Sequence, residues 1–303
     1  MQVTVIGLGS IGMGIAASLL RDGHAVVGVD IAPERREELE EMGGSFEPGV
    51  RQACCLAEVV VSVVVDARQT ESVVFGEDGA AHSMRPDTVL VSCATLPPER
   101  TRDLARRLEV TGRHFLDAPT SGGPAKARSG EMTLMASGSS TAFAKAGPVL
   151  KSMASKVCRL GDEPGVGSAM KLVNQHLAGV HIAVACEAMA LAIRLGLDPR
   201  QVYEVISQAA GSSWMFENRV LHILDGDYSP KSATSIFTKD LGIVLDTARS
   251  NHFPVPMAST GLQMFEMAAA AGMQGDDDTS IIRVFAKLAG ISLPESAKAE
   301  DGT

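Results

Sequence analysis

Short apolar runs rich in β-branched residues alternate with amphipathic segments over the first 160 residues. These runs cover residues 3–6, 25–29, 59–65, 88–92, 114–117, 132–136 and 156–160. The first runs are apolar on both faces, which is typical of strands that helices cover on both sides of a sheet. The alternation predicts an α/β fold with a doubly wound parallel sheet, in which the later strands can be antiparallel.

The pattern changes from residue 165 onward to the longer period of helices. Predicted helices cover residues 167–195, 200–210, 215–225, 236–250, 257–271 and 279–288. The first would be roughly 40 Å long and is apolar nearly all round, so we expect a long interdomain helix. It would join a sheet domain at 1–163 to an all-α C-terminal domain at 164–291, and residues 292–303 are expected to be a disordered tail.

The first predicted strand runs directly into a glycine-rich turn at the start of a helix. This turn is Gly7-Leu8-Gly9-Ser10-Ile11-Gly12. Gly7 permits the tight turn, Gly9 lets the backbone approach a pyrophosphate, and Gly12 allows close contact between strand and helix. Asp30 ends the next strand, about 20 residues further on, where an acid binds the adenosine ribose. The spacing predicts a Rossmann-type domain that binds NAD.

Asp30 favours NAD over NADP, because a carboxylate hydrogen-bonds two ribose hydroxyls and repels a 2′-phosphate. Arg35 and Arg36 leave some use of NADP open, since either side chain could reach a phosphate. Both lie among glutamates, which is more typical of a solvated helix face with paired charges.

Composition narrows the classes of function. The chain has 303 residues, 45% hydrophobic residues and a formal net charge of −9, which argues against a nucleic-acid or anionic-membrane surface. Its five cysteines form no C-x-x-C pair, so we expect no disulfide framework or zinc site and a location in the reducing cytoplasm.

The first predicted strand starts at Met1, so we expect no secretory leader. The longest apolar stretch contains charged residues and indicates a buried helix rather than a membrane span.

The acids Asp276, Asp277 and Asp278 precede a predicted helix that begins at residue 279. Three consecutive carboxylates could suggest a calcium site. Acids at a helix start interact favourably with its dipole, so we interpret them as capping residues and expect no metal.

Lys171 stands alone on the apolar face of the long helix, and lysines are seldom buried without a partner or a function. Asn174 and Gln175, three and four residues further on, lie beside it on a helix. A lysine with neighbouring amides can hold an alcohol oxygen and take its proton. A lysine that extends to the surface is an equally good interpretation from the residues alone.

A second candidate is the turn at 117–124, which follows a strand and contains Ser121 and consecutive glycines. Backbone amides in such a turn can bind a carboxylate, and a plain turn is the alternative. Ser121 is not expected to be a hydrolytic nucleophile, because the Gly-x-Ser-x-Gly pattern is absent.

Four of these motifs occur together in the order and spacing of a known family. They are the glycine turn at 7–12, the segment 117–123, Gly130-Glu131-Met132-Thr133-Leu134-Met135, and Gly167-x-x-x-Lys171-x-x-Asn174. Over residues 1–291 the chain resembles the β-hydroxyacid dehydrogenase family, which includes 3-hydroxyisobutyrate dehydrogenase and tartronate semialdehyde reductase.

The resemblance implies NAD-dependent oxidation of a small hydroxy acid, with Lys171 as the general acid and base. It assigns substrate binding to Ser121, Gly122, Gly123, Asn174 and Gln175. It assigns cofactor binding to Gly7, Leu8, Gly9, Ser10, Ile11, Gly12, Asp30, Val65, Asp66, Thr95 and Lys239. The long apolar helix further suggests a homodimer or homotetramer.

The chain departs from the family pattern at three positions. Gln175 replaces a second asparagine, Ala94 replaces a serine and Ser92 replaces an aspartate. Asn174-Gln175, with the segments 213–219 and 222–228, is most similar to the branch that oxidises L-threonate, and polar groups suit a substrate with several hydroxyls. The alternatives are activity on 3-hydroxyisobutyrate or tartronate semialdehyde, a non-catalytic NAD-binding module, and imine reduction, which is the weakest because imine reductases generally replace this lysine.

Overall fold

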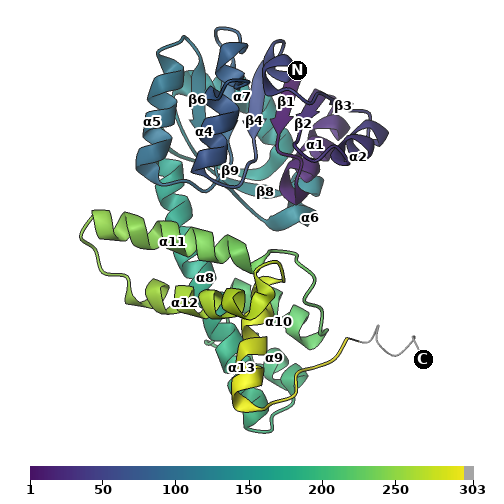
Figure 1. Cartoon of the computed structure of the whole chain (residues 1–303), viewed down its shortest axis with the longest axis vertical. Helices are drawn as coiled ribbons and strands as arrows, with labels where there is room; N and C mark the ends of the chain where they lie inside the picture. Colours follow the sequence, from purple (N-terminus) through teal and green to yellow (C-terminus); the bar gives the residue numbers. More distant parts are fainter. Residues whose placement is uncertain (297–303) are drawn as a thin grey trace. The chain divides into compact units, whose positions relative to one another are not determined.

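A computed structural model describes residues 1–296 and divides the chain into two compact units, Met1–Lys171 and Leu172–Thr303 (Figure 1). The division falls inside helix α8 (Val166–Arg194), whereas the sequence places the boundary just before this helix, at 163/164. Of the predicted tail, residues 292–296 form no regular element and residues 297–303 lie outside the described part.

The first unit is built around one nine-stranded sheet with the order β3-β2-β1-β4-β5-β6-β8-β7, in which β9 pairs with β8. The strands are β1 (Gln2–Ile6), β2 (Ala25–Val29), β3 (Ser45–Phe46), β4 (Val59–Ser62), β5 (Val89–Ser92), β6 (His114–Asp117), β7 (Thr120–Ser121), β8 (Met132–Ser137) and β9 (Ala154–Gly161). Strands β1 to β6 pair in parallel, and β8 is antiparallel to β6 and β7. The predicted Rossmann-type sheet is confirmed.

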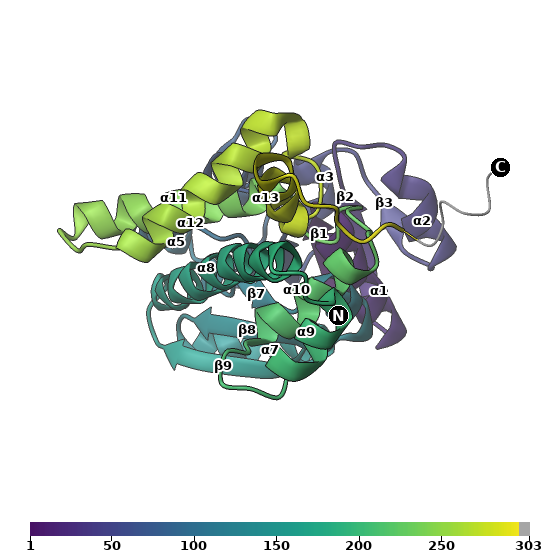
Figure 2. The ribbon, with the colours of Figure 1, turned by 90° about the horizontal axis from the view of Figure 1, so that it is seen from below.

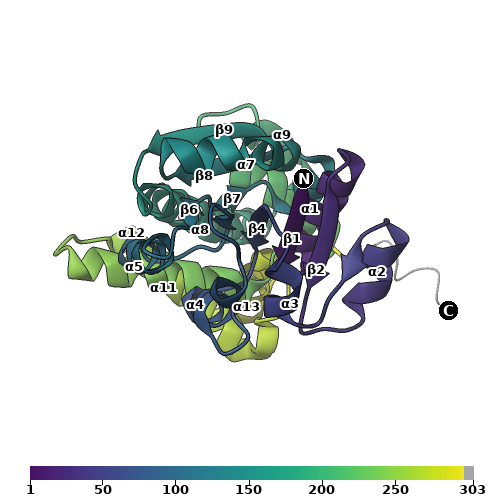
Figure 3. The same ribbon diagram turned by 90° about the horizontal axis from the view of Figure 1, so that it is seen from above.

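Helices cover both faces of this sheet (Figure 3). They are α1 (Ser10–Arg21), α2 (Arg35–Glu41), α3 (Val50–Cys54), α4 (Ala67–Phe75), α5 (Pro98–Glu109), α6 (Gly123–Ser129) and α7 (Ser140–Met153). Val89 and Val91 of β5 face the core beneath α1 and α7, and Leu90 faces the core beneath α4 and α5. Successive side chains of a strand point to opposite faces, which is why these strands are apolar throughout.

The second unit is helical, as predicted. It consists of the later part of α8 together with α9 (Pro199–Ile206), α10 (Trp214–Leu224), α11 (Thr234–Ser250), α12 (Pro256–Ala268) and α13 (Ile281–Ala289). Helices α11 and α12 pack side by side (Figures 1 and 2), and Phe237 and Phe265 stack between them with ring centroids 5.1 Å apart. The predicted helix at 257–271 ends early in a π-helical turn, where Gly272 adopts a positive φ.

Helix α8 has the length and apolar composition of a membrane-spanning helix, criteria that the core helix of a globular protein also meets. Half of its most apolar window is buried inside the structure. Its residues Ile182, Cys186 and Met189 are among the most buried in the core of the second unit. We therefore interpret α8 as a core helix.

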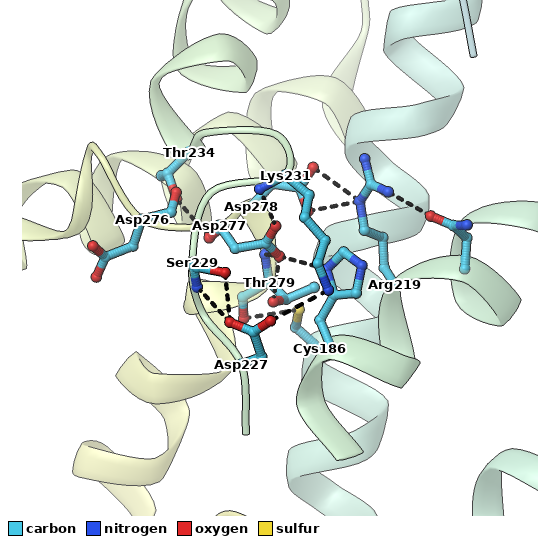
Figure 4. A network of polar contacts seen from close by, with 12 residues as sticks. Cys186, Arg219, Asp227, Ser229, Lys231, Thr234, Asp276, Asp277, Asp278 and Thr279 are labelled. Atoms are coloured by element: carbon cyan, nitrogen blue, oxygen red, sulfur yellow. Dashed lines mark hydrogen bonds and ion pairs between the residues drawn. The ribbon is translucent and has the colours of Figure 1, made fainter. Parts of the chain in front are cut away.

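A buried polar cluster holds the second unit together between α10 and the segment before α13 (Figure 4). Asp277 accepts hydrogen bonds from the backbone and side chain of Thr279, and its carboxylate lies 2.9 Å from Nδ1 of His222. Asp278 pairs with Nε of Arg219 at 2.9 Å, and both aspartates are 0% exposed. Asp277 therefore caps the 3-10 turn at Asp278–Ser280 that leads into α13, in agreement with the capping interpretation, whereas Asp278 pairs with Arg219 and does not cap a helix.

Burial raises the pKa of Asp278 to about 6, against the opposing attraction of the Arg219 guanidinium. Burial also acts to raise the pKa of Asp277, but hydrogen bonds from His222 and Thr279 outweigh it and the net shift is downward. The Asp278 carboxylate thus depends on Arg219 to stay charged in the core.

Arg219→Met should lower the free energy of unfolding by about 3–5 kcal/mol, because it leaves the buried Asp278 carboxylate without its cationic partner. A raised pKa means that the folded state holds the Asp278 proton more tightly than the unfolded state, so acid relieves the unpaired charge. The loss should consequently be smaller at pH 5 than at pH 8. Urea denaturation followed by fluorescence of Trp214, the only tryptophan and part of α10, measures it.

The matched control is Arg249→Met, because Arg249 pairs with Asp246 on α11 and both side chains are 78% exposed. Exposed pairs contribute little, so this variant should unfold at nearly the parent's urea concentration. Equal losses in the two variants would contradict a special role for the buried pair.

Candidate active site

The glycine turn between β1 and α1 has the local geometry of a phosphate cradle. Gly7 has φ +90°, and a Cβ there would lie 2.9 Å from the carbonyl oxygen of Val63. A Cβ on Gly12 would lie 1.8 Å from the Gly7 carbonyl oxygen, so strand and helix approach this closely only without side chains. A Cβ on Gly9 would meet no atom of the described residues within 4 Å, so the space above the turn is open.

Helix α1 begins at Ser10 with Gly9 as its N-cap, and no side chain of the described residues caps it. Its first amides are therefore available to an anion, and the helix dipole adds to the attraction. Leu8 is fully buried, whereas Ser10 is exposed and Ile11 is half-buried. The residues of the turn thus fit a dinucleotide pyrophosphate.

Asp30 lies directly after β2 and is joined to the glycine turn. Its Oδ2 accepts a hydrogen bond from the Leu8 amide at 2.5 Å, and its Oδ1 accepts one from the Ala32 amide at 2.8 Å. A carboxylate has about four acceptor positions, so Asp30 can bind the ribose hydroxyls while it holds the turn.

The two arginines that left NADP open are paired with glutamates of α2. Arg35 lies 3.8 Å from Glu38, and Arg36 lies 3.8 Å from Glu40. All four side chains are about half exposed, as expected for the charged outer face of a helix.

The predicted cofactor residues Val65, Asp66 and Thr95 follow β4 and β5, at the carboxyl edge where ligands bind to doubly wound sheets. Val65 is 56% exposed, and its amide donates to the side chain of Gln69. Asp66 caps α4 by accepting from the Gln69 amide at 2.7 Å. Thr95 is buried beside this edge.

Lys171 is 8% exposed, and its Nζ donates a hydrogen bond to the carbonyl oxygen of Thr120 at 2.8 Å. The next residues are the turn that the sequence predicts for carboxylate binding, Ser121, Gly122 and Gly123. Gly122 and Gly123 have φ +143° and +79°, values that L side chains rarely adopt. Within the first unit the candidate base therefore lies next to the candidate carboxylate site. The alternative interpretation, in which Lys171 extends to solvent, does not agree with its burial.

The start of α8 is bonded to the ends of β6 and β8. Oδ2 of Asp117 accepts from the amides of Gly165 and Ser168, at 2.9 and 2.7 Å, and Oδ1 accepts from the Ser168 hydroxyl. Oγ of Ser137 accepts from the Gly167 amide at 2.9 Å. From the sequence, Asp117 is recognisable only as part of a motif, because no local signal connects it with residues about 50 positions away.

The other predicted residues form a polar chain in the second unit. Nδ2 of Asn174 donates to Oε1 of Gln175, whose Nε2 donates to Asp240 at 2.5 Å. The other Asp240 oxygen accepts from Lys239 at 2.5 Å. Asp240 is 2% exposed and Gln175 is 6% exposed, so Asp240 joins these three side chains from a buried position. Asp240 is not among the site residues expected from the sequence, although its place next to Lys239 is a signal.

Models of two families match the chain. The NAD binding domain of 6-phosphogluconate dehydrogenase matches residues 2–161, and the NAD-binding domain of NADP-dependent 3-hydroxyisobutyrate dehydrogenase matches residues 165–285. The first unit is thus a nicotinamide-dinucleotide-binding domain, in agreement with the glycine turn.

Similar proteins carry dehydrogenase names. L-Threonate dehydrogenase of Cupriavidus necator is 50% identical over 98% of this chain and 99% of its own length. The 3-hydroxyisobutyrate dehydrogenase of Pseudomonas aeruginosa is 32% identical over 94% and 98%. A crystal structure described as 3-hydroxyisobutyrate dehydrogenase from Salmonella typhimurium is 46% identical, covers 94% of this chain and 99% of its own, and has a TM-score of 0.89.

These matches extend over both units, and the cofactor turn, the buried lysine and the glycine turn beside it are those that the resemblance specifies. The chain therefore belongs to the 3-hydroxyisobutyrate dehydrogenase family of NAD-dependent hydroxyacid dehydrogenases.

Proposed function

We propose that this protein oxidises L-threonate at C2 to the corresponding 2-oxo acid, 2-dehydro-L-erythronate, with NAD. The observation that carries the proposal is that five relatives named L-threonate dehydrogenase, from several bacteria, are 45–50% identical over nearly the full chain. The amides of Asn174 and Gln175 support it, because hydroxyl groups of a sugar acid need polar partners.

In this reaction Lys171 is the general base. The glycine turn at 7–12 and Asp30 would hold NAD, whose nicotinamide ring would supply the hydride acceptor. The neutral Lys171 amine takes the proton of the C2 hydroxyl as the C2–H bond breaks, so the carbon becomes a carbonyl and the proton leaves through the lysine. The Thr120 carbonyl holds Nζ in place for this transfer, and in the reverse direction the same ammonium protonates the carbonyl oxygen.

The substrate carboxylate would bind the turn formed by Ser121, Gly122 and Gly123, because the positive φ angles of the two glycines give the turn a backbone shape in which successive amides can face an anion. Lys171 lies against the residue just before this turn, so an acid held there presents its C2 hydroxyl next to the amine. Such orientation is the main contribution that a binding turn makes to rate.

The cofactor preference in this proposal is NAD over NADP. The Asp30 carboxylate is held by two backbone amides at the position of the adenosine ribose, where a 2′-phosphate would meet its negative charge. Arg35 and Arg36, which could neutralise a phosphate, are engaged with glutamates.

The second candidate function is oxidation of 3-hydroxyisobutyrate. It is favoured by the name of the Salmonella structure, which is as similar to this chain as several of the L-threonate dehydrogenases. The methyl group of that substrate calls for an apolar wall, which the Asn174 and Gln175 amides do not supply. A non-catalytic binding module is disfavoured by the buried Lys171 on the glycine turn.

The proposal predicts a kcat/KM for L-threonate with NAD at least tenfold above that for 3-hydroxyisobutyrate or for reduction of tartronate semialdehyde. Steady-state rates from absorbance of the reduced nicotinamide, with each acid at several concentrations, measure this ratio. Repeating the series with NADP should give clearly lower values because of Asp30. A tenfold preference for 3-hydroxyisobutyrate would reverse the assignment.

Replacing Lys171 by alanine or methionine should reduce kcat by about 10²–10⁴-fold, the usual contribution of a positioned general base. Calorimetric titration should give unchanged NAD affinity, because the glycine turn and Asp30 are untouched. The control is Lys151→Met, an exposed lysine on α7 of the same unit, which should keep parental rates. If the Lys171 variants retained more than about a hundredth of the parental kcat, another group would have to move the proton.

We further propose a cytoplasmic enzyme that self-associates, since all five cysteines are free and one face of α8 is exposed and apolar. This stripe consists of Val173, Leu177, Val184, Leu191 and Leu195, each more than half exposed. Their spacing of four and seven residues places them on one side of the helix, where a second copy would cover them.

Sedimentation velocity should accordingly give a dimer or tetramer. The double variant Leu177→Glu and Leu191→Glu should shift the protein toward the monomer with unchanged far-UV circular dichroism, because both side chains are exposed in the single chain. A parent protein that sediments as a monomer at micromolar concentration would exclude this use of the stripe.

A further inference from the structure

The backbone amides at the start of α8 are buried and need hydrogen-bond acceptors. The first amides of any helix lack partners within the helix, and here they lie in a buried region. Ser137 and Ser168 are 0% exposed, and Asp117 is 1% exposed. Water therefore does not reach these amides, and the protein itself has to supply the acceptors.

Two side chains from neighbouring strands supply them. Asp117 ends β6 and Ser137 ends β8, and the two residues are directly paired in the sheet. Asp117 accepts from the amides of Gly165 and Ser168, and Ser137 accepts from the amide between them, that of Gly167. Acceptors from two strands thus fix three donors around one helical turn, which determines both the position and the rotation of the helix start.

The backbone of α8 also comes very close to the strand ends at Gly167. A Cβ on Gly167 would lie 2.3 Å from the carbonyl oxygen of Met135 and 3.0 Å from that of Asp117. The helix backbone therefore rests directly on the strand ends, and no side chain intervenes that could tilt. Ser168 adds a link to α5, because its hydroxyl lies 2.8 Å from that of Thr101.

Lys171 follows Ser168 by three residues, so it stands about one turn above this contact on the same side of the helix. Its Nζ donates to the carbonyl of Thr120, three residues after Asp117. The short segment 117–120 therefore contacts both the helix start, through Asp117 at the Ser168 amide, and the end of the lysine side chain, through Thr120.

We propose that Asp117 is a positioning residue for the proton transfer: it fixes the first turn of α8 so that the Lys171 amine meets the substrate hydroxyl at the reactive distance. This inference rests on the proposed role of Lys171 as general base. Misplacement of a reacting group by about 1 Å can cost about 10²-fold in rate, so a fixed helix start has a direct effect on kcat.

Asp117 does not itself exchange protons with the substrate. Each of its oxygens already accepts from donors of the protein, and the side chain is almost completely enclosed. Burial raises the pKa of Asp117, and the hydrogen bonds from Ser168, Gly165 and Ser137 oppose that shift. To fix the helix start, Asp117 needs two correctly placed acceptor oxygens, and it does not need to titrate.

Asparagine can supply the same geometry. Its carbonyl oxygen can take the place of Oδ2 and accept from the amides of Gly165 and Ser168. Its NH₂ group can take the place of Oδ1 and donate to the Ser168 hydroxyl, which then donates to Thr101 instead. Alanine supplies neither acceptor, so the two substitutions separate positioning from charge.

The experiment compares the full-length parent, Asp117→Asn and Asp117→Ala with NAD and the best hydroxy acid of the parent. We expect Asp117→Asn to keep kcat within about threefold, and Asp117→Ala to lose about 10- to 100-fold in kcat with unchanged NAD affinity. The solvent deuterium isotope effect on kcat should rise in Asp117→Ala, because proton transfer becomes more rate-limiting. A loss of folded enzyme alone would leave that isotope effect unchanged.

The control is Ser139→Ala, which removes the cap of another helix in the same unit, since the Ser139 hydroxyl accepts from the Ala142 amide at the start of α7. It should change stability but neither kcat nor the isotope effect. If Asp117→Ala does not fold, Ser168→Ala is used in its place. That variant loses the hydroxyl bonds to Asp117 and Thr101 but keeps the Ser168 amide bond to Asp117, and it should lower kcat about two- to fivefold.

Hydrogen exchange at residues 165–171 supplies a readout that does not depend on activity, and it should be faster in Asp117→Ala than in Asp117→Asn or the parent. If the parent oxidises no hydroxy acid, the proposed function fails, and the exchange result alone decides whether Asp117 fixes the helix start. Unchanged kcat and exchange in a folded Asp117→Ala would overturn the inference. Equal loss of activity in the Asn and Ala variants would overturn it in favour of the negative charge itself.

Discussion

The amides at the start of a buried helix need acceptors, and this requirement shapes the site of the first unit. At α8 the acceptors come from Asp117 and Ser137, and the absence of a side chain at Gly167 lets the helix rest on the strand ends. The position of Lys171 follows from that contact, because the residue lies one turn further along a rigid helix. The same strand end continues into the glycine turn beside the lysine, so the proposed base and the proposed carboxylate site share one support.

A second helix start in this unit has the opposite design. Helix α1 is capped by Gly9, whose missing side chain leaves open space in front of the first amides. Helix α8 has its amides taken by the protein itself, and α1 leaves them to a pyrophosphate. The difference lies in the residues around each start: Asp117 and Ser137 from neighbouring strands occupy the amides of α8, and the missing side chain of Gly9 leaves the space before α1 open. In the proposed enzyme, one physical property of helices would thus serve in one case to fix the general base and in the other to bind the cofactor.

The sequence predicts those features whose partners are close together along the chain. The cofactor turn is readable because Gly7, Gly9, Gly12 and the following helix are adjacent, and Asp30 stands at a fixed spacing from them. Lys171 is noticeable because it is the only lysine of a long apolar helix. The role of Asp117 depends on amides about 50 residues away and on the pairing of β6 with β8, which no local pattern specifies. The strands β3 and β7 are not predicted for a related reason: with two residues each, they are too short to show alternation.

The substitution at Gln175 has a physical consequence that its sequence position alone does not reveal. The longer side chain reaches Asp240 with its NH₂ group and still accepts from Asn174 with its carbonyl oxygen. Both ends of the Gln175 amide are therefore engaged within the second unit, and the direction of its bond to Asn174 leaves the Asn174 carbonyl as the end that can accept a hydroxyl proton. Asp240 meanwhile binds Lys239 through its second oxygen, which fixes a positive charge at the end of the same chain. In the proposed reaction this arrangement gives a polyhydroxy acid an acceptor of defined orientation, whereas a methyl group could not donate to it, and this difference favours the sugar acid.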